Sequence, residues 1–151
     1  MYTDPRVVEF VKRNFVPVRV HVKDTKDAFK TLADKYDAHW TPAILLVDSS
    51  GTERHRIEGF LPADDFLSQL ALGAAKAAFA RQDYSSAEQL YREVAERYPA
   101  TDAAPEAQYW TGVSRYRATS DVQALKDTAQ AFGDRYQRRL DRGGAVEPLF
   151  R

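Results

Sequence analysis

The feature that most constrains the fold is a change of hydrophobic pattern near residue 62. Before that point, segments with the strand period of two alternate with segments that have the helical period of 3.6. After it, only the helical period recurs. The first part is therefore expected to combine a β-sheet with helices, and the rest to consist of helices packed on one another.

Two helices are expected in the first part. Asp4 ahead of Pro5 is a typical helix start, and the apolar spacing that follows predicts a helix to about Asn14. A second helix is expected after Asp24 or Thr25, either of which can cap it, because apolar residues then recur at helical spacing. Each helix would present one apolar stripe to a core.

Three strands are expected around these helices. Residues 15–22 alternate valines with other residues, which predicts the first strand. Residues 43–47 form a continuous apolar run, as in a strand covered on both faces. After a turn over residues 48–51, residues 53–59 predict a strand whose polar positions suit a sheet edge.

The second part is expected to contain helical hairpins supported by one long helix. Pro62 begins a helix that can continue to Gln82 and so bridge both parts. The motif Ser85-x-x-Glu88 is a capping box, which predicts the start of the next helix. Residues 141–151 are expected to form an irregular tail.

This second part resembles tetratricopeptide repeats, in which two helices cross through small side chains. A first repeat is indicated at Ala75, Ala78, Tyr84, Ala87, Tyr91, Val94 and Pro99. A second, diverged repeat is indicated at Ala107, Trp110, Gly112, Tyr116, Ala124, Ala131 and Tyr136. Repeats of this kind usually need about three units to bury enough surface, so these two must lean on another element. The helix that begins at Pro62 is the expected support.

The first part resembles a thioredoxin-like domain over roughly residues 2–72. The resemblance lies in Trp40-Thr41-Pro42 directly before a buried strand, then Val-Asp-x-x-Gly, then Ile57-Glu58-Gly59-Phe60. The resemblance implies that Pro42 follows a cis peptide bond. In members of that family the corresponding proline faces a reactive cysteine. The resemblance also implies that the backbone of the preceding residue, here Thr41, pairs with an extended substrate peptide.

The fold class is accordingly expected to be α/β, a shortened thioredoxin-like sheet with flanking helices that continues into a tetratricopeptide-like helical extension. The expected domains are residues 1–72 for the thioredoxin-like part and residues 73–140 for the helical hairpins, before the tail.

The chain contains no cysteine, which separates it from the active members of the family it resembles. In the family the reactive cysteine lies at the start of the first helix, after at least one strand, where free amides and the helix dipole stabilise a thiolate. The segment that would carry it is not present ahead of the first expected helix. Two explanations stay open: a start placed too far downstream, or a binding protein that has lost its active site. Without cysteines the default compartment is the cytoplasm.

The predicted function is protein or peptide binding by a cysteine-free, non-catalytic module. The alternative is a thiol-disulfide oxidoreductase whose cysteine-bearing N-terminus is not part of this chain, which would leave the present chain inactive. A third hypothesis is an assembly subunit that works as a homodimer.

Three sets of residues are candidate interaction sites. The loop Trp40, Thr41 and Pro42 is the first, through the family resemblance. The second is the edge of the strand predicted over residues 15–22, where an apolar edge invites a second copy or a partner strand; its residues are Val16, Val18, Val20 and Val22. The third is a groove of the repeats, with Tyr109, Trp110 and Tyr116.

Composition excludes several other classes of partner and ligand. Lys plus Arg and Asp plus Glu number 22 each, so no net field gathers nucleic acid or an anionic membrane. No apolar run has the length that a membrane span needs. The three histidines, His21, His39 and His55, are far apart in sequence and are interpreted as scattered surface residues, so no metal site and no cofactor are expected.

Overall fold

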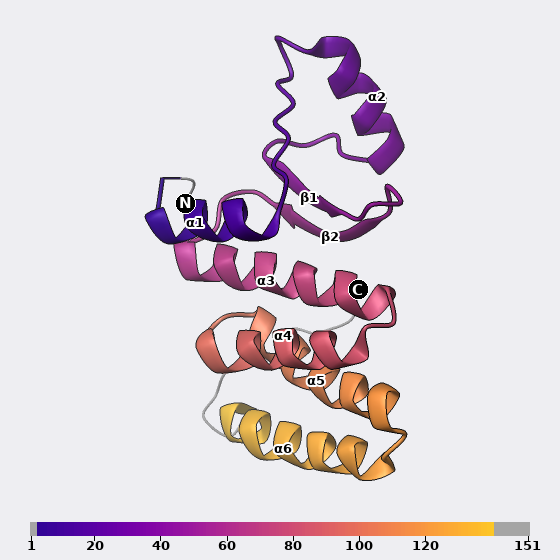
Figure 1. The fold of residues 1–151 in the computed structure, drawn as a ribbon. Coiled ribbons are helices and arrows are strands. Elements are labelled where there is room, and N and C mark those ends of the chain that lie inside the picture. The colour runs from indigo at the N-terminus through magenta and orange to yellow at the C-terminus, as the bar shows by residue number, and fades with distance from the viewer. Residues whose placement is uncertain (1–2, 141–151) are drawn as a thin grey trace.

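The computed structural model describes residues 3–140, so the expected tail lies outside the described residues. Helix α3 is central in the arrangement (Figure 1): α1 and a β-hairpin lie on one side of it, and α4, α5 and α6 follow one another on the other side. The part described is mostly helical, with a two-stranded antiparallel sheet. Its elements are α1 (Pro5–Asn14), α2 (Lys26–Tyr36), β1 (Ala43–Val47), β2 (Glu53–Glu58), α3 (Ala63–Ala80), α4 (Tyr84–Arg97), α5 (Ala103–Thr119) and α6 (Val122–Leu140).

Helix α1 begins and ends as its sequence predicts. The Asp4 carboxylate accepts a hydrogen bond from the Arg6 backbone N–H at 2.9 Å, as an N-cap residue does. The Arg6 guanidinium reaches Asp64 at 2.8 Å, which joins the first turns of α1 and α3. Val7 is buried in a core that these two helices share with the hairpin. The amphipathic pattern of α1 is therefore satisfied by packing against α3.

The hairpin is asymmetric, and this corrects one expectation. Leu46 and Ile57 are buried on the side of α3, whereas Val47 at the end of β1 is exposed. The prediction that β1 is covered on both faces is therefore wrong. Within the described residues β1 has a strand on one edge only, with Ala43 opposite Glu58, so the sheet is too small for a second complete layer of helices.

The strand predicted over residues 15–22 is not formed, and this is the main correction to the expected fold. Residues 15–20 have no regular secondary structure, and a turn follows them. Val16 is 91% exposed and Val18 is 80% exposed. Alternating valines favour a strand, but a strand also needs a neighbour for its backbone hydrogen bonds, and no described segment supplies one here.

Helix α2 is held to the hairpin mainly at its C-terminal end. Arg56 of β2 donates to the carbonyl oxygens of Asp37, at 2.9 Å, and Tyr36, which are free because the helix ends there. The Tyr36 hydroxyl also lies 3.1 Å from the Gly51 carbonyl oxygen. At the other end, Thr25 occupies the N-cap position but makes no side-chain cap hydrogen bond. Helix α2 is thus anchored by one arginine and one tyrosine.

Helix α3 is continuous and supports both parts of the molecule, as expected. Phe66 and Leu70 lie in the core with α1 and the hairpin, whereas Leu72 and Ala75 lie in the core with α4 and α5. A helix that is apolar on opposite faces is typical of a buried position between two layers. The expected boundary between residues 72 and 73 therefore falls inside one helix.

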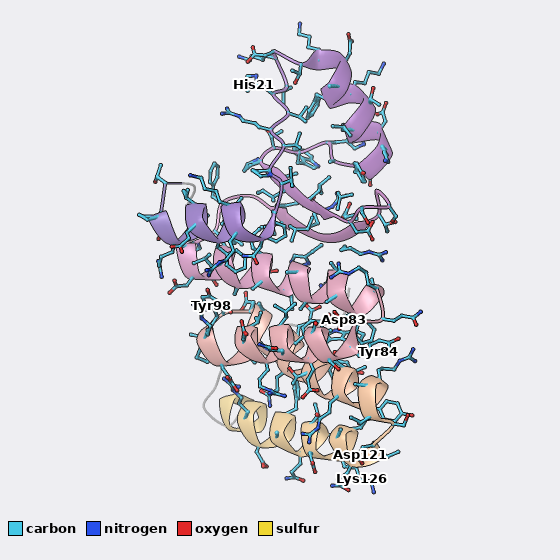
Figure 2. The ribbon with its side chains drawn as sticks, in the orientation of Figure 1. His21, Asp83, Tyr84, Tyr98, Asp121 and Lys126 are labelled. Atoms are coloured by element: carbon cyan, nitrogen blue, oxygen red, sulfur yellow. The ribbon has the colours of Figure 1, made fainter. Side chains whose placement is uncertain are left out.

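Aspartates cap α4 and α6, and the cap of α4 differs from the predicted Ser85 by two residues. Asp83, labelled in Figure 2, caps α4 by accepting from the Ser86 N–H at 3.2 Å, so Ser85 lies inside the helix. Asp121, also labelled there, accepts from the Gln123 N–H at 2.9 Å at the start of α6. Aspartate and serine are comparable N-caps, so local sequence alone did not select between them.

Candidate functional site

The best candidate site is the end of the hairpin where β1 begins and β2 ends. The Thr41–Pro42 peptide bond is cis there, as the resemblance implied. The Gly59 N–H donates to the Pro42 carbonyl oxygen at 2.9 Å, which extends the pairing of the two strands by one step. Gly59 has a φ of 79°, a conformation that glycine adopts without strain, and the chain then turns towards α3.

Two large aromatic side chains flank this hairpin end. Trp40 is 79% exposed and Phe60 is 73% exposed. Trp40 lies two residues before Pro42, and Phe60 directly follows Gly59, the residue that is paired with Pro42. Within residues 3–140, the backbone of Thr41 makes no hydrogen bond. Exposed aromatic rings beside free backbone groups can bind an extended peptide, through apolar contact and main-chain pairing.

The three predicted groove residues occupy different environments. Trp110 is partly buried against the core, with its ring centroid 5.1 Å from that of Phe79 and 6.3 Å from that of Tyr91. Tyr109 is exposed, and its ring lies 5.5 Å from Trp110. Tyr116 is partly buried. The structure thus brings Tyr109 and Trp110 together but makes Trp110 a packing residue in large part.

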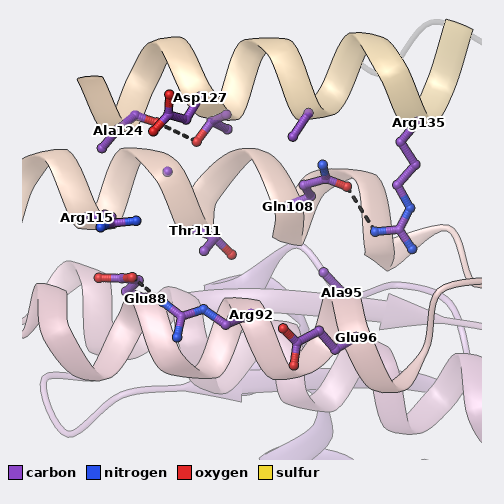
Figure 3. A pocket seen from close by; sticks show the side chains of 13 residues that line it. Glu88, Arg92, Ala95, Glu96, Gln108, Thr111, Arg115, Ala124, Asp127 and Arg135 are labelled. Atoms are coloured by element: carbon purple, nitrogen blue, oxygen red, sulfur yellow. Dashed lines mark hydrogen bonds and ion pairs between the residues drawn. The ribbon is translucent and has the colours of Figure 1, made fainter. Parts of the chain in front are cut away.

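A groove does exist among α4, α5 and α6, but another face of α5 lines it (Figure 3). It has a volume of about 290 Å³. Arg92 pairs with Glu88 on its α4 side, and Arg135 of α6 donates to Gln108 of α5 at 3.0 Å. Cations and carboxylates alternate around the groove, so its surface is polar and close to balanced in charge. Its cations are Arg92, Arg115 and Arg135, and its carboxylates are Glu88, Glu96 and Asp127.

The histidines are not brought together. His21 is exposed and lies 3.0 Å from Asp24, and His39 is exposed and lies 3.0 Å from Asp37. His55 instead is partly buried between β2 and α3, so the interpretation of all three as surface residues is wrong for His55. Within the described part of the chain, no group of three or more His, Asp or Glu residues is placed to hold a metal ion.

Sequence reasoning missed the role of His55, although a signal was present. His55 precedes Ile57 by two residues on the same strand, and Ile57 is a core residue, so His55 faces the same side. Burial lowers the pKa of His55, and the nearby Lys76 ammonium lowers it further. The histidine therefore belongs to the packing between hairpin and helices, apart from the exposed hairpin end.

Comparison with known families supports the resemblance for the first part. Residues 1–74 match the family model of a thioredoxin-like domain. The matched range covers α1, α2, the hairpin and about the first three turns of α3, while α4, α5 and α6 lie outside it. No curated protein and no solved structure matches the chain. Among residues 3–140, no helix has the length and apolar character required to cross a membrane.

Proposed function

We propose that this chain is a non-catalytic protein- or peptide-binding module, in which a thioredoxin-like part presents the binding loop and a tetratricopeptide-like helical part supports it. The observation that carries the proposal is the exposure of Trp40 and Phe60 beside the unpaired backbone of Thr41. Large aromatic side chains supply much of the binding energy at protein interfaces. The free backbone N–H and C=O groups of Thr41 can pair with the main chain of an extended peptide and so fix its orientation.

A suitable probe is the carbamidomethylated insulin B chain, an extended apolar peptide whose thiols are blocked. Binding is expected to shift Trp40 emission to shorter wavelength, because the ring becomes desolvated, and to leave the emission of a Trp40→Phe variant almost unchanged. Affinities of the variants are measured by isothermal titration calorimetry, and Trp40→Ala and Phe60→Ala are each expected to weaken binding by about tenfold, a typical loss for an aromatic residue at the centre of an interface.

Tyr109→Ala is the matched control, since it removes an exposed aromatic ring from α5, away from the hairpin. Its affinity for the probe should equal that of the unsubstituted chain. Unchanged affinity in both Trp40→Ala and Phe60→Ala would show that this loop is not the binding site.

The family match favours a second candidate, a thiol-disulfide oxidoreductase. Its chemistry requires a thiolate that attacks a disulfide sulfur, and this chain has no cysteine. The same preparation is therefore expected to leave the dithiothreitol-driven reduction of intact insulin at its uncatalysed rate. Acceleration by the purified chain would overturn the non-catalytic proposal.

A further inference from the structure

Residues 16–20, called here the unpaired segment, have the composition of a strand; residues 16–19 are exposed and Val20 is half-buried. Within residues 3–140, its backbone N–H and C=O groups make no hydrogen bond. Its valines, Val16, Val18 and Val20, recur at the strand period of two. An exposed and unpaired stretch of this kind is a template for another strand.

The surroundings of the unpaired segment are cationic. Arg19 lies within it, Arg13 precedes it and Lys23 follows it, and none of these three has an ion-pair partner in the part of the chain that the structure describes. The neighbouring His21 does have one, the Asp24 carboxylate. The whole chain has no net charge, so this local excess of positive charge favours a partner with carboxylates.

The same charges disfavour a second copy of the chain at this position. Antiparallel pairing of two unpaired segments would bring Arg19 and its cationic neighbours close to their own copies. Like charges on opposite residues of a strand pair are destabilising. The charge pattern therefore argues against the symmetric dimer expected from the sequence and for an acidic strand.

We propose that the unpaired segment binds an extended acidic peptide by strand pairing. The peptide backbone pairs with residues 16–20, its apolar side chains lie on the face of the valines, and its carboxylates lie on the face of Arg19. This inference rests on the proposed function, because both make the chain a peptide-binding module, but it uses residues outside the Pro42 loop.

The experiment measures fluorescence anisotropy with two labelled synthetic peptides of about seven residues, the length of an ordinary strand. One peptide alternates valine with glutamate, and the other alternates valine with lysine. The glutamate peptide is expected to bind, with an affinity that falls as salt rises, and the lysine peptide is expected not to bind. Hydrogen exchange should slow at residues 16–20 when the glutamate peptide is added.

Two substitutions test the two parts of the proposal. Arg19→Glu should weaken binding of the glutamate peptide by about tenfold, because the new carboxylate repels the carboxylates of the peptide. The same substitution should create binding of the lysine peptide, because the new carboxylate attracts its ammonium groups. Val18→Pro removes a backbone N–H and should abolish strand pairing. Lys126→Glu is the matched control for charge: it makes the same change at an exposed residue of α6 and should have no effect.

The outcomes separate this inference from the proposed function. Equal binding of both peptides, or full binding by Val18→Pro with unchanged helical circular dichroism, would overturn the inference. Binding that is lost in Trp40→Ala but kept in Arg19→Glu would place the peptide at the Pro42 loop, which supports the proposed function and refutes the inference. A concentration-dependent dimer that the glutamate peptide does not dissociate would assign the unpaired segment to a second copy.

Discussion

His55 lies where β2, α3 and α5 come together, and both nitrogens of its ring have partners. Nε2 lies 2.7 Å from Gln69 Oε1, and Nδ1 lies 3.2 Å from Lys76 Nζ. The Lys76 ammonium can only donate and the Gln69 carbonyl oxygen can only accept, so Nε2 carries the hydrogen and Nδ1 accepts. Lys76 in turn lies 2.8 Å from Glu106 of α5. The neutral ring therefore links the hairpin to the helical part.

This arrangement predicts that the protein loses stability in mild acid. Burial and the Lys76 charge lower the pKa of His55, against the opposite effects of Gln69, Glu106 and Glu53. The unfolded chain takes up a proton at an ordinary histidine pKa of about 6.5, whereas the folded chain takes it up only at lower pH. Between those two values the unfolded state binds more protons, so the free energy of unfolding falls as pH decreases below about 6.5.

The measurement is urea unfolding at pH 7.5, 6.5 and 5.5 for the unsubstituted chain and for His55→Gln. Glutamine cannot take up a proton, so the variant should lose less stability over this interval. His39→Gln is the control for the substitution itself, because it makes the same change at an exposed residue outside the packing between hairpin and helices, and the pH dependence of His55→Gln should differ from that of this control. The same pH dependence in His55→Gln as in the unsubstituted chain would contradict the role given to His55.

The sequence predicted residues with local roles better than residues with distant partners. The Asp4 cap follows from its neighbours in the chain, and the cis bond before Pro42 was implied by the family resemblance at Trp40-Thr41-Pro42; both are present. The network of His55 depends on Lys76 and Glu106, which are brought to it only when α3 and α5 pack against the hairpin. Similarly, the sequence predicted Trp110 as a groove residue, whereas its ring packs against Phe79 and Tyr91 of the neighbouring helices.

At the scale of elements, helices were predicted well because their hydrogen bonds are internal. Helix α1 and strand β1 have almost the predicted bounds, and helix α2 begins where it was expected, directly after Thr25. Residues 15–22 were predicted as a strand from side-chain alternation alone, and alternation does not supply the second strand that pairing requires. Strand β2 met that requirement because a short turn returns the chain beside β1.

The packing of α5 on α6 depends on one glycine. A Cβ atom placed on Gly112 would lie 1.7 Å from Thr128 Oγ1 and 2.5 Å from Thr128 Cβ, so the two helices could not keep their separation. Gly112→Ala is therefore expected to loosen α6, with faster hydrogen exchange along that helix and a loss of stability of roughly 1–3 kcal/mol, the usual cost of overpacking.

Gly133→Ala is the matched control, because nothing lies within 4 Å of a Cβ at that position of α6. Alanine favours the interior of a helix over glycine by roughly 0.5–1 kcal/mol, so this variant should be slightly more stable than the unsubstituted chain. If Gly112→Ala were as stable as Gly133→Ala, the close approach of α5 and α6 would be refuted.

At the scale of the whole molecule, α3 makes two cores into one body. Leu70 faces the core with α1 and the hairpin, and Leu72 faces the core with α4 and α5. Because α3 contributes side chains to both cores, displacing it from one core would also expose apolar surface of the other. The thioredoxin-like and helical parts should therefore unfold together. Family resemblance divides the chain near the middle of α3, whereas packing does not.

Leu70→Ala tests this coupling from one side of α3 to the other. The substitution removes a side chain that packs in the hairpin core and should cost about 2–5 kcal/mol. The observable is the emission of Trp110, which packs in the other core, in a Trp40→Phe background where it is the only tryptophan. Its unfolding midpoint in urea should decrease together with the midpoint from circular dichroism.

A Val122→Ala variant provides the comparison, since Val122 is exposed on α6 and should leave both midpoints unchanged. A Trp110 midpoint that stayed constant while the circular dichroism became biphasic would mean that the two cores unfold separately. A joint decrease would instead mean that any partner which binds the hairpin end stabilises the helices as well, because a ligand of the folded state stabilises the whole cooperative unit.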